Sequence, residues 1–154
     1  KISMWLSYPF STIVLCTSPS WWIFKHNINH HNWCNVPEKD EDILALDGAF
    51  TPNNKGSSAF VKKYKFLIFW GAIFFMYPAF IMQSYSYVLK RKRYGEFALM
   101  MLHWFLIWGP IFYVLPFSSA ITVFLVLYFV LSAWLSLGFM TNHLGCEVFN
   151  LKES

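Results

Sequence analysis

Two long apolar stretches in the second half of the chain constrain its fold most strongly. Residues 97–117 and 119–140 contain no Asp, Glu, Lys or Arg, and a helix needs about 20 apolar residues to cross the core of a bilayer. Inside lipid every backbone polar group must be satisfied within the segment, which favours helices. A turn at residues 116–119 joins the two stretches. The sequence therefore predicts a transmembrane helical hairpin.

The composition of the 154-residue chain also indicates a membrane protein. Hydrophobic residues make up 56% and charged residues 13% of the chain, whereas soluble domains contain about 25% charged residues. This balance excludes a disordered chain, a coiled coil and a collagen. Cys16, Cys34 and Cys146 show no framework spacing, so we expect free thiols in a reducing compartment.

The net charge of +4 arises from clustered basic residues. One cluster comprises Lys62, Lys63 and Lys65, and the other occupies residues 90–93. In a chain this apolar, such clusters are typical of the flanks of membrane segments. No nucleic-acid recognition motif accompanies them, so we expect no nucleic-acid partner.

A third apolar segment, residues 66–82, lies between the two basic clusters. As a helix it would reach about 26 Å, which is marginal against a bilayer core of about 30 Å. The positive-inside rule places both flanks on the cytoplasmic face. The segment is therefore predicted to be an interfacial or partly inserted helix, broken near Pro78. Three true spans remain the alternative, and they would place the histidine cluster at residues 26–31 and the polar tail near residue 143 on opposite faces.

The strongest local signal is a histidine cluster between a double tryptophan and an acidic turn. His26, His30 and His31 fall within six residues, and neutral imidazole is the commonest biological metal ligand. On an α-helix His26 and His30 share one face, whereas His31 diverges by about 100°. This arrangement suits two metals better than one tight site. The alternative is a set of solvated side chains at a membrane interface.

The residues around the cluster have their own expected roles. At least one of Trp21 and Trp22 is expected to lie in an interfacial aromatic belt. Nearby polar side chains can bind the second ring N–H of a ligating histidine and fix its tautomer. These candidates are Asn27, Asn29, Asn32, Asn35 and Asp40.

Two histidines lie outside the cluster. His103 falls inside the first predicted span, where an ionisable residue suggests function by default. A neutral histidine bonded to a neighbouring helix is nevertheless the favoured interpretation. His143 directly follows the second span. If the hairpin returns to the cytoplasmic face, His143 lies level with the cluster and becomes a further candidate ligand.

The residues around the histidine cluster resemble a known motif. The matching positions are Trp21, Trp22, Lys25, His26, Asn27, His30, His31, Asn35, Asp40, Asp42 and Ile43. This pattern closely resembles the second histidine box of the membrane fatty acid desaturases, and it is most similar to the front-end acyl desaturases of lipids and acyl-CoAs. Asn142, His143 and Gly145 resemble that family's region before its third box.

The resemblance implies an all-α membrane protein, with a transmembrane helical hairpin, interfacial helices and the histidine cluster at the cytoplasmic face. Residues 1–154 are then part of a single membrane desaturase domain. We expect a histidine-box region at 1–36, a polar loop at 37–64, an interfacial helix and basic flank at 65–96, the transmembrane hairpin at 97–140 and a cytoplasmic tail at 141–154.

The resemblance also implies a chemistry. In this family two iron ions held by histidines activate O₂, and an unactivated acyl chain gains a cis double bond. His26, His30, His31 and His143 would be iron ligands, with no catalytic residue beyond them. Asn35 and Asn142 would support them. Asp40 and Asp42 would shape the loop or bind ring N–H groups, unless they form only a solvated acidic turn.

Partners and location follow from the same resemblance. The substrate would be an acyl-CoA or acyl-lipid, and membrane lipid would surround the protein. The resemblance implies cytochrome b5 or a ferredoxin as the electron donor. The chain has no haem-binding pair and no cysteine cluster, so we expect this donor to lie elsewhere. An integral, multi-pass protein of this kind lies in the endoplasmic reticulum of a eukaryote or the inner membrane of a bacterium.

The sequence departs from the family pattern in two places. Only 25 residues precede His26 and none is a histidine, and the 11 residues after His143 contain no His-His pair. The first and third boxes of the family are therefore missing. We expect a central fragment that is inactive alone. The alternatives are a membrane di-iron hydroxylase of the same superfamily and a degenerate, non-catalytic membrane protein.

Overall fold

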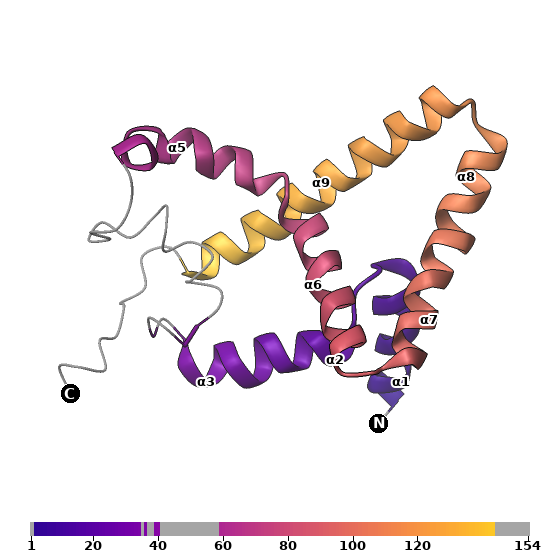
Figure 1. Cartoon of the computed structure of the whole chain (residues 1–154), viewed down its shortest axis with the longest axis horizontal. Helices are drawn as coiled ribbons and strands as arrows, with labels where there is room; N and C mark the ends of the chain where they lie inside the picture. The colour runs from indigo at the N-terminus through magenta and orange to yellow at the C-terminus, as the bar shows by residue number, and fades with distance from the viewer. Residues whose placement is uncertain (1, 35, 37–38, 41–58, 144–154) are drawn as a thin grey trace.

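The computed structural model describes residues 2–34, 36, 39–40 and 59–143, and its regular structure is entirely helical (Figure 1). Within these ranges the side chains of residues 2–5, 62, 65, 69 and 140–143 are not described. The predicted all-α membrane fold is confirmed in this part of the chain.

The first part of the chain leads into the histidine cluster. Its helices are α1 (Ile2–Pro9), η1 (Phe10–Val14), α2 (Pro19–Trp22), η2 (Ile23–His30) and α3 (His31–Trp33), where η denotes a π-helix.

Ser18 starts the helix that carries the histidines. Its extended backbone precedes Pro19 at the first helical position, and its Oγ accepts a hydrogen bond from the N–H of Trp21 at 3.0 Å. Serine is a preferred N-cap, and proline fits the first turn because its missing N–H would have no helical partner there. From this cap α2, η2 and α3 run on without a break, along the lower left of Figure 1.

The third apolar segment forms two helices, α5 (Ala59–Ile73) and α6 (Met76–Lys90), bent by 63°. Pro78 explains the position of the break, because a proline ring clashes with the carbonyl four residues earlier, here that of Phe74. The predicted break near Pro78 is confirmed. By length and composition the pair is one broken span or a re-entrant element, so its interfacial position stays a prediction. α5 also begins before the expected end of the polar loop at residue 64.

The two predicted spans form helices that are long and apolar enough to cross a membrane. α7 (Tyr94–His103), η3 (Trp104–Trp108) and α8 (Gly109–Val114) form one apolar stretch of 21 residues. After Leu115 and Pro116 the chain reverses into α9 (Phe117–His143). The part of α9 up to Phe139 is also long and apolar enough to cross a membrane. The hairpin opens as a wide V at the right of Figure 1.

α6 packs against α9, α2 and α7 and so connects the hairpin to the N-terminal helices. The buried core centres on Cys16, Tyr77, Ile81, Val88 and Met100. Tyr77 shows how the elements are tied, since its hydroxyl donates to the Leu15 carbonyl at 2.8 Å and its N–H donates to Ser132 Oγ at 3.2 Å.

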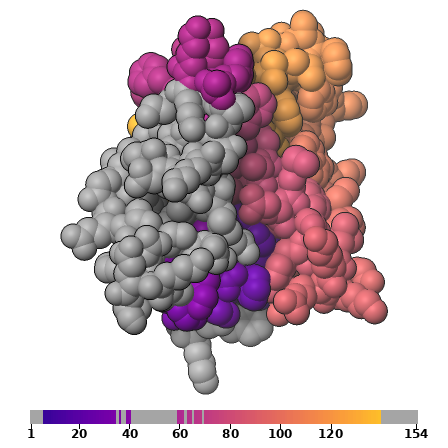
Figure 2. Space-filling model, turned by 60° about the vertical axis from the view of Figure 1, so that its left-hand side comes forward, coloured from indigo at the N-terminus to yellow at the C-terminus, as the bar shows by residue number. Residues whose placement is uncertain are grey.

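Large apolar side chains cover the outside of the hairpin. Tyr113 is 92% and Phe105 is 75% exposed, and water-facing surfaces rarely carry contiguous apolar patches of this kind. A lipid environment accounts for them. Figure 2 shows another side of the molecule, where the corner between α6 and α7 lies uncovered at the lower right. That corner carries the exposed basic residues 90–93.

Candidate metal centre

The three histidine rings form one close cluster, in which His31 lies nearer to His26 than an α-helix would place it. The ring centroid of His26 lies 5.1 Å from that of His30 and 4.7 Å from that of His31. The ring centroids of His30 and His31 are 5.6 Å apart. The cause is the π-helix η2, in which the N–H of His31 donates to the carbonyl of His26. This i to i+5 bond widens the turn and brings His31 beside His26. The expected divergence of His31 is therefore wrong, because it assumed α-helical spacing.

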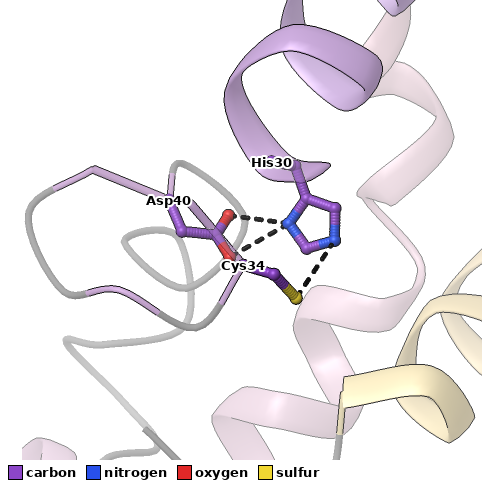
Figure 3. Close-up of side chains that lie close together, drawn as sticks. All are labelled: His30, Cys34 and Asp40. Atoms are coloured by element: carbon purple, nitrogen blue, oxygen red, sulfur yellow. Dashed lines mark hydrogen bonds and ion pairs between the residues drawn. The ribbon is translucent and has the colours of Figure 1, made fainter. Parts of the chain in front are cut away.

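Asp40 orients one of these rings. His30 Nδ1 lies 3.0 Å from both carboxylate oxygens of Asp40, and both side chains are buried (Figure 3). An ionised carboxylate only accepts hydrogen bonds, so the Nδ1–H must donate. In the neutral ring Nε2 then carries the lone pair, which is the arrangement that second partners impose on metal-binding histidines. The predicted ability of Asp40 to bind a ring N–H is confirmed.

Cys34 faces the other nitrogen of the same ring. Its Sγ lies 3.8 Å from His30 Nε2, and its side chain is exposed (Figure 3). His30, Cys34 and Asp40 each offer an atom within 4.8 Å of the others. They do not surround one ion in this arrangement, because Asp40 and Cys34 contact opposite nitrogens of the imidazole. The pocket lies on the Nε2 side of the ring, since Cys34 lines it and Asp40 does not.

The two tryptophans before the cluster pack inward. Trp22 stacks on His26 with centroids 4.4 Å apart and an interplanar angle of 20°. Trp21 is 4% exposed and meets Phe80 edge to face at 5.2 Å. Trp21 is too buried to face a membrane interface, whereas Trp22 is only partly buried. The expected aromatic-belt role of at least one of the two stays a prediction. Trp22 also supports a histidine ring.

A pocket of about 430 Å³ opens beside the cluster. One wall comes from the histidine-bearing helices and the other from α9, and the lining residues are His26, His30, His31, Cys34, Trp134, Leu135, Gly138 and Phe139. The ring of Phe139 meets His26 edge to face at 6.0 Å. The end of the second span therefore reaches the histidine cluster, as the hairpin predicts.

Glu96 anchors the histidine-bearing helix to the hairpin, and sequence reasoning missed it. Its buried carboxylate in the first turn of α7 accepts hydrogen bonds from Ser18 Oγ at 2.5 Å, from Ser20 Oγ, and from the Ser20 N–H at 3.4 Å. Arg93 Nη1 also donates to it at 3.2 Å. A buried charge is stable only when it is paired and hydrogen-bonded, and this set of donors meets the requirement. The signal in the sequence was an acidic residue at the start of a span.

His103 is structural, as expected. Its Nδ1 donates to the carbonyl of Ile13 at 2.8 Å, and its Nε2 accepts from Trp108 Nε1 at 2.9 Å. One nitrogen donates and the other accepts, so the ring is neutral. It ties η1 to the first span.

The structure leaves some candidates without a described side chain. His143 and Asn142 are described only as the backbone at the end of α9, one helical turn after Phe139. Asn35, Asp42 and Cys146 lie outside the described residues. Their roles stay predictions.

Comparison with known proteins shows which family the chain matches. The profile described as "Fatty acid desaturase" matches residues 2–153. An acyl-lipid (9-3)-desaturase from Physcomitrium patens is 28% identical over 161 residues, which cover 94% of this chain. The chain spans 30% of that relative's length. No solved structure matches the chain.

Proposed function

This chain belongs to the fatty acid desaturase family, and we propose that it carries part of a di-iron centre that introduces a cis double bond into a long acyl chain. The family implies an oxidoreductase in general terms. One observation carries the finer proposal: three close imidazoles form one wall of a pocket whose opposite wall is apolar. A pocket of this mixed character can bring a hydrocarbon next to a bound metal.

The residues present fit iron. Imidazole nitrogens suit this metal, and the contact with Asp40 gives His30 the tautomer that a ligand needs. We propose His26, His30 and His31 as ligands, with His143 as a fourth from the end of α9. Iron with O₂ supplies the oxidising power for an unactivated C–H bond, which no side chain has.

Four histidines do not complete two iron sites. We therefore propose that further ligands lie outside this stretch of sequence and that the stretch alone is inactive. Within it the side chains have distinct tasks. Trp22 holds the plane of the His26 ring, Asp40 holds that of His30, and Phe139 and Leu135 form part of the apolar wall that faces the imidazoles.

The surroundings indicate the partners. The apolar wall suits the chain of an acyl-lipid or acyl-CoA, and the exposed basic residues 90–93 suit an anionic head group or an acidic electron donor. We propose cytochrome b5 or a ferredoxin as that donor. The protein would be multi-pass, in the endoplasmic reticulum of a eukaryote or the inner membrane of a bacterium.

The test uses the intact protein in cells, with fatty acids analysed by mass spectrometry and iron measured in the purified protein. We expect a product two mass units lighter than its substrate, together with bound iron. His30→Ala should abolish both while the protein still inserts into membranes. Ile28→Ala, an exposed change on the same helix, should leave both unchanged. A gain of one oxygen without a double bond would indicate a hydroxylase and overturn the proposal, as would full turnover in His30→Ala.

A further inference from the structure

Gly138 leaves a gap in the apolar wall of the pocket. It lies in α9 between Trp134 and Phe139, all three of which line the pocket. Apart from its chain neighbours and the backbone of its own helix, a Cβ built at Gly138 would meet no atom of the described residues within 4 Å. A glycine in a helix interior is less stable than alanine, and the backbone here is helical. Neither crowding nor backbone geometry therefore explains the missing side chain.

We propose that Gly138 determines substrate specificity, because the acyl chain crosses α9 through the gap that this residue leaves. This inference rests on the proposed function for the identity of the chain as an acyl substrate. It adds the path of that chain and the residue that limits its width.

The surroundings of Gly138 define the path. Trp134 lines the pocket and is 77% exposed on the outer surface of α9. Trp134 and Gly138 are four residues apart and so share one face of the helix. The pocket therefore opens at a surface that lipid covers when α9 spans the membrane. An acyl chain can enter sideways from the bilayer, pass Trp134 and reach the imidazoles at Gly138.

The size of the pocket fits part of such a chain. A volume of about 430 Å³ lies within the range of about 300–1,000 Å³ for small-molecule sites. One methylene more or less in an apolar pocket changes discrimination about 10- to 200-fold. A leucine at position 138 adds several carbons where a Cβ has open space. The Gly138→Leu protein should therefore fold and should lose at least about tenfold in kcat/KM for a long acyl chain.

The experiment uses a graded series in the intact protein: Gly138→Ala, Gly138→Leu and Gly138→Phe. Leu137→Phe is the matched control, because Leu137 is the adjacent residue in α9, is exposed and does not line the pocket. Two quantities are measured in membranes. One is kcat/KM for desaturation, and the other is covalent labelling of residues 134–139 by a diazirine-bearing acyl chain. Only labelling that excess unmodified chain displaces is counted.

We expect both quantities to fall in the order alanine, leucine, phenylalanine at position 138, with iron content unchanged. Leu137→Phe should stay within about twofold of wild type. If Gly138→Phe does not accumulate, the alanine and leucine variants decide the result. The inference is overturned if Gly138→Leu keeps wild-type labelling and kcat/KM, or if Leu137→Phe loses as much.

The labelling separates this inference from the proposed function. Displaceable labelling of the wild type without any desaturation would refute the proposed function and leave the acyl-chain path standing. The absence of displaceable labelling in a wild type that desaturates would refute the path alone.

Discussion

Asp40 holds both of its carboxylate oxygens 3.0 Å from Nδ1 of His30, although ten residues separate the two along the chain. The pair is buried, so water forms few hydrogen bonds with either side chain. The contact fixes which nitrogen of His30 presents its lone pair to the pocket. It also joins the segment after α3 to the histidine cluster.

Asp40→Ala should weaken iron binding without removing a proposed ligand. Loss of an outer partner of a metal-binding histidine typically costs about 10–100-fold in affinity or activity. The affinity is measured by competition with a chelator in the intact protein. Ile28→Ala, an exposed change on η2, is the control and should have no effect. An unchanged iron affinity in Asp40→Ala would show that His30 needs no orienting partner.

Glu96→Ala should destabilise the folded protein and move the histidine-bearing helix. The change leaves the hydroxyls of Ser18 and Ser20 without their acceptor, and buried groups left in this state cost roughly 1–3 kcal/mol. Thermal unfolding in detergent measures the loss. Arg93→Ala removes only a half-exposed partner of the same carboxylate. It should therefore lower the free energy of unfolding by less than about 1 kcal/mol. Equal losses in the two variants would contradict an anchoring role for Ser18 and Ser20.

The parts of this structure that local chemistry decides could be predicted from the sequence. Charge-free segments predicted the hairpin, and Pro78 predicted the break, because a proline acts on the residues just before it. The closeness of His31 to His26 could not be predicted, since nothing in residues 21–31 distinguishes a π-turn from an α-turn. The contacts of Glu96 with Ser18 and Ser20 span 78 and 76 residues. They depend on how the hairpin packs, which no local pattern specifies.

His103→Phe should lower stability but leave the metal centre able to function. The substitution deprives the Ile13 carbonyl and the Trp108 N–H of their partners, at a cost of at least about 1 kcal/mol. We expect a lower midpoint of thermal unfolding, with normal iron content and substantial desaturation below it. Loss of iron in protein that remains folded would instead make His103 part of the metal centre.

Cys16 and Cys34 should differ sharply in their reaction with a thiol reagent. Cys34 is exposed beside the pocket, whereas Cys16 is fully buried in the core. Burial raises the pKa of the Cys16 thiol above its ordinary value of 9.0, so less of the reactive thiolate forms at a given pH. Because the folded-state pKa is the higher one, the stabilisation from the neutral thiol is present below about pH 9 and is lost as the pH rises through the raised value.

In a Cys146→Ser background at pH 8, we expect Cys34 to react rapidly and Cys16 only after denaturation. Mass spectrometry of the labelled peptides checks this, and rapid labelling of Cys16 in the folded protein would contradict the packing of η1 against the first span.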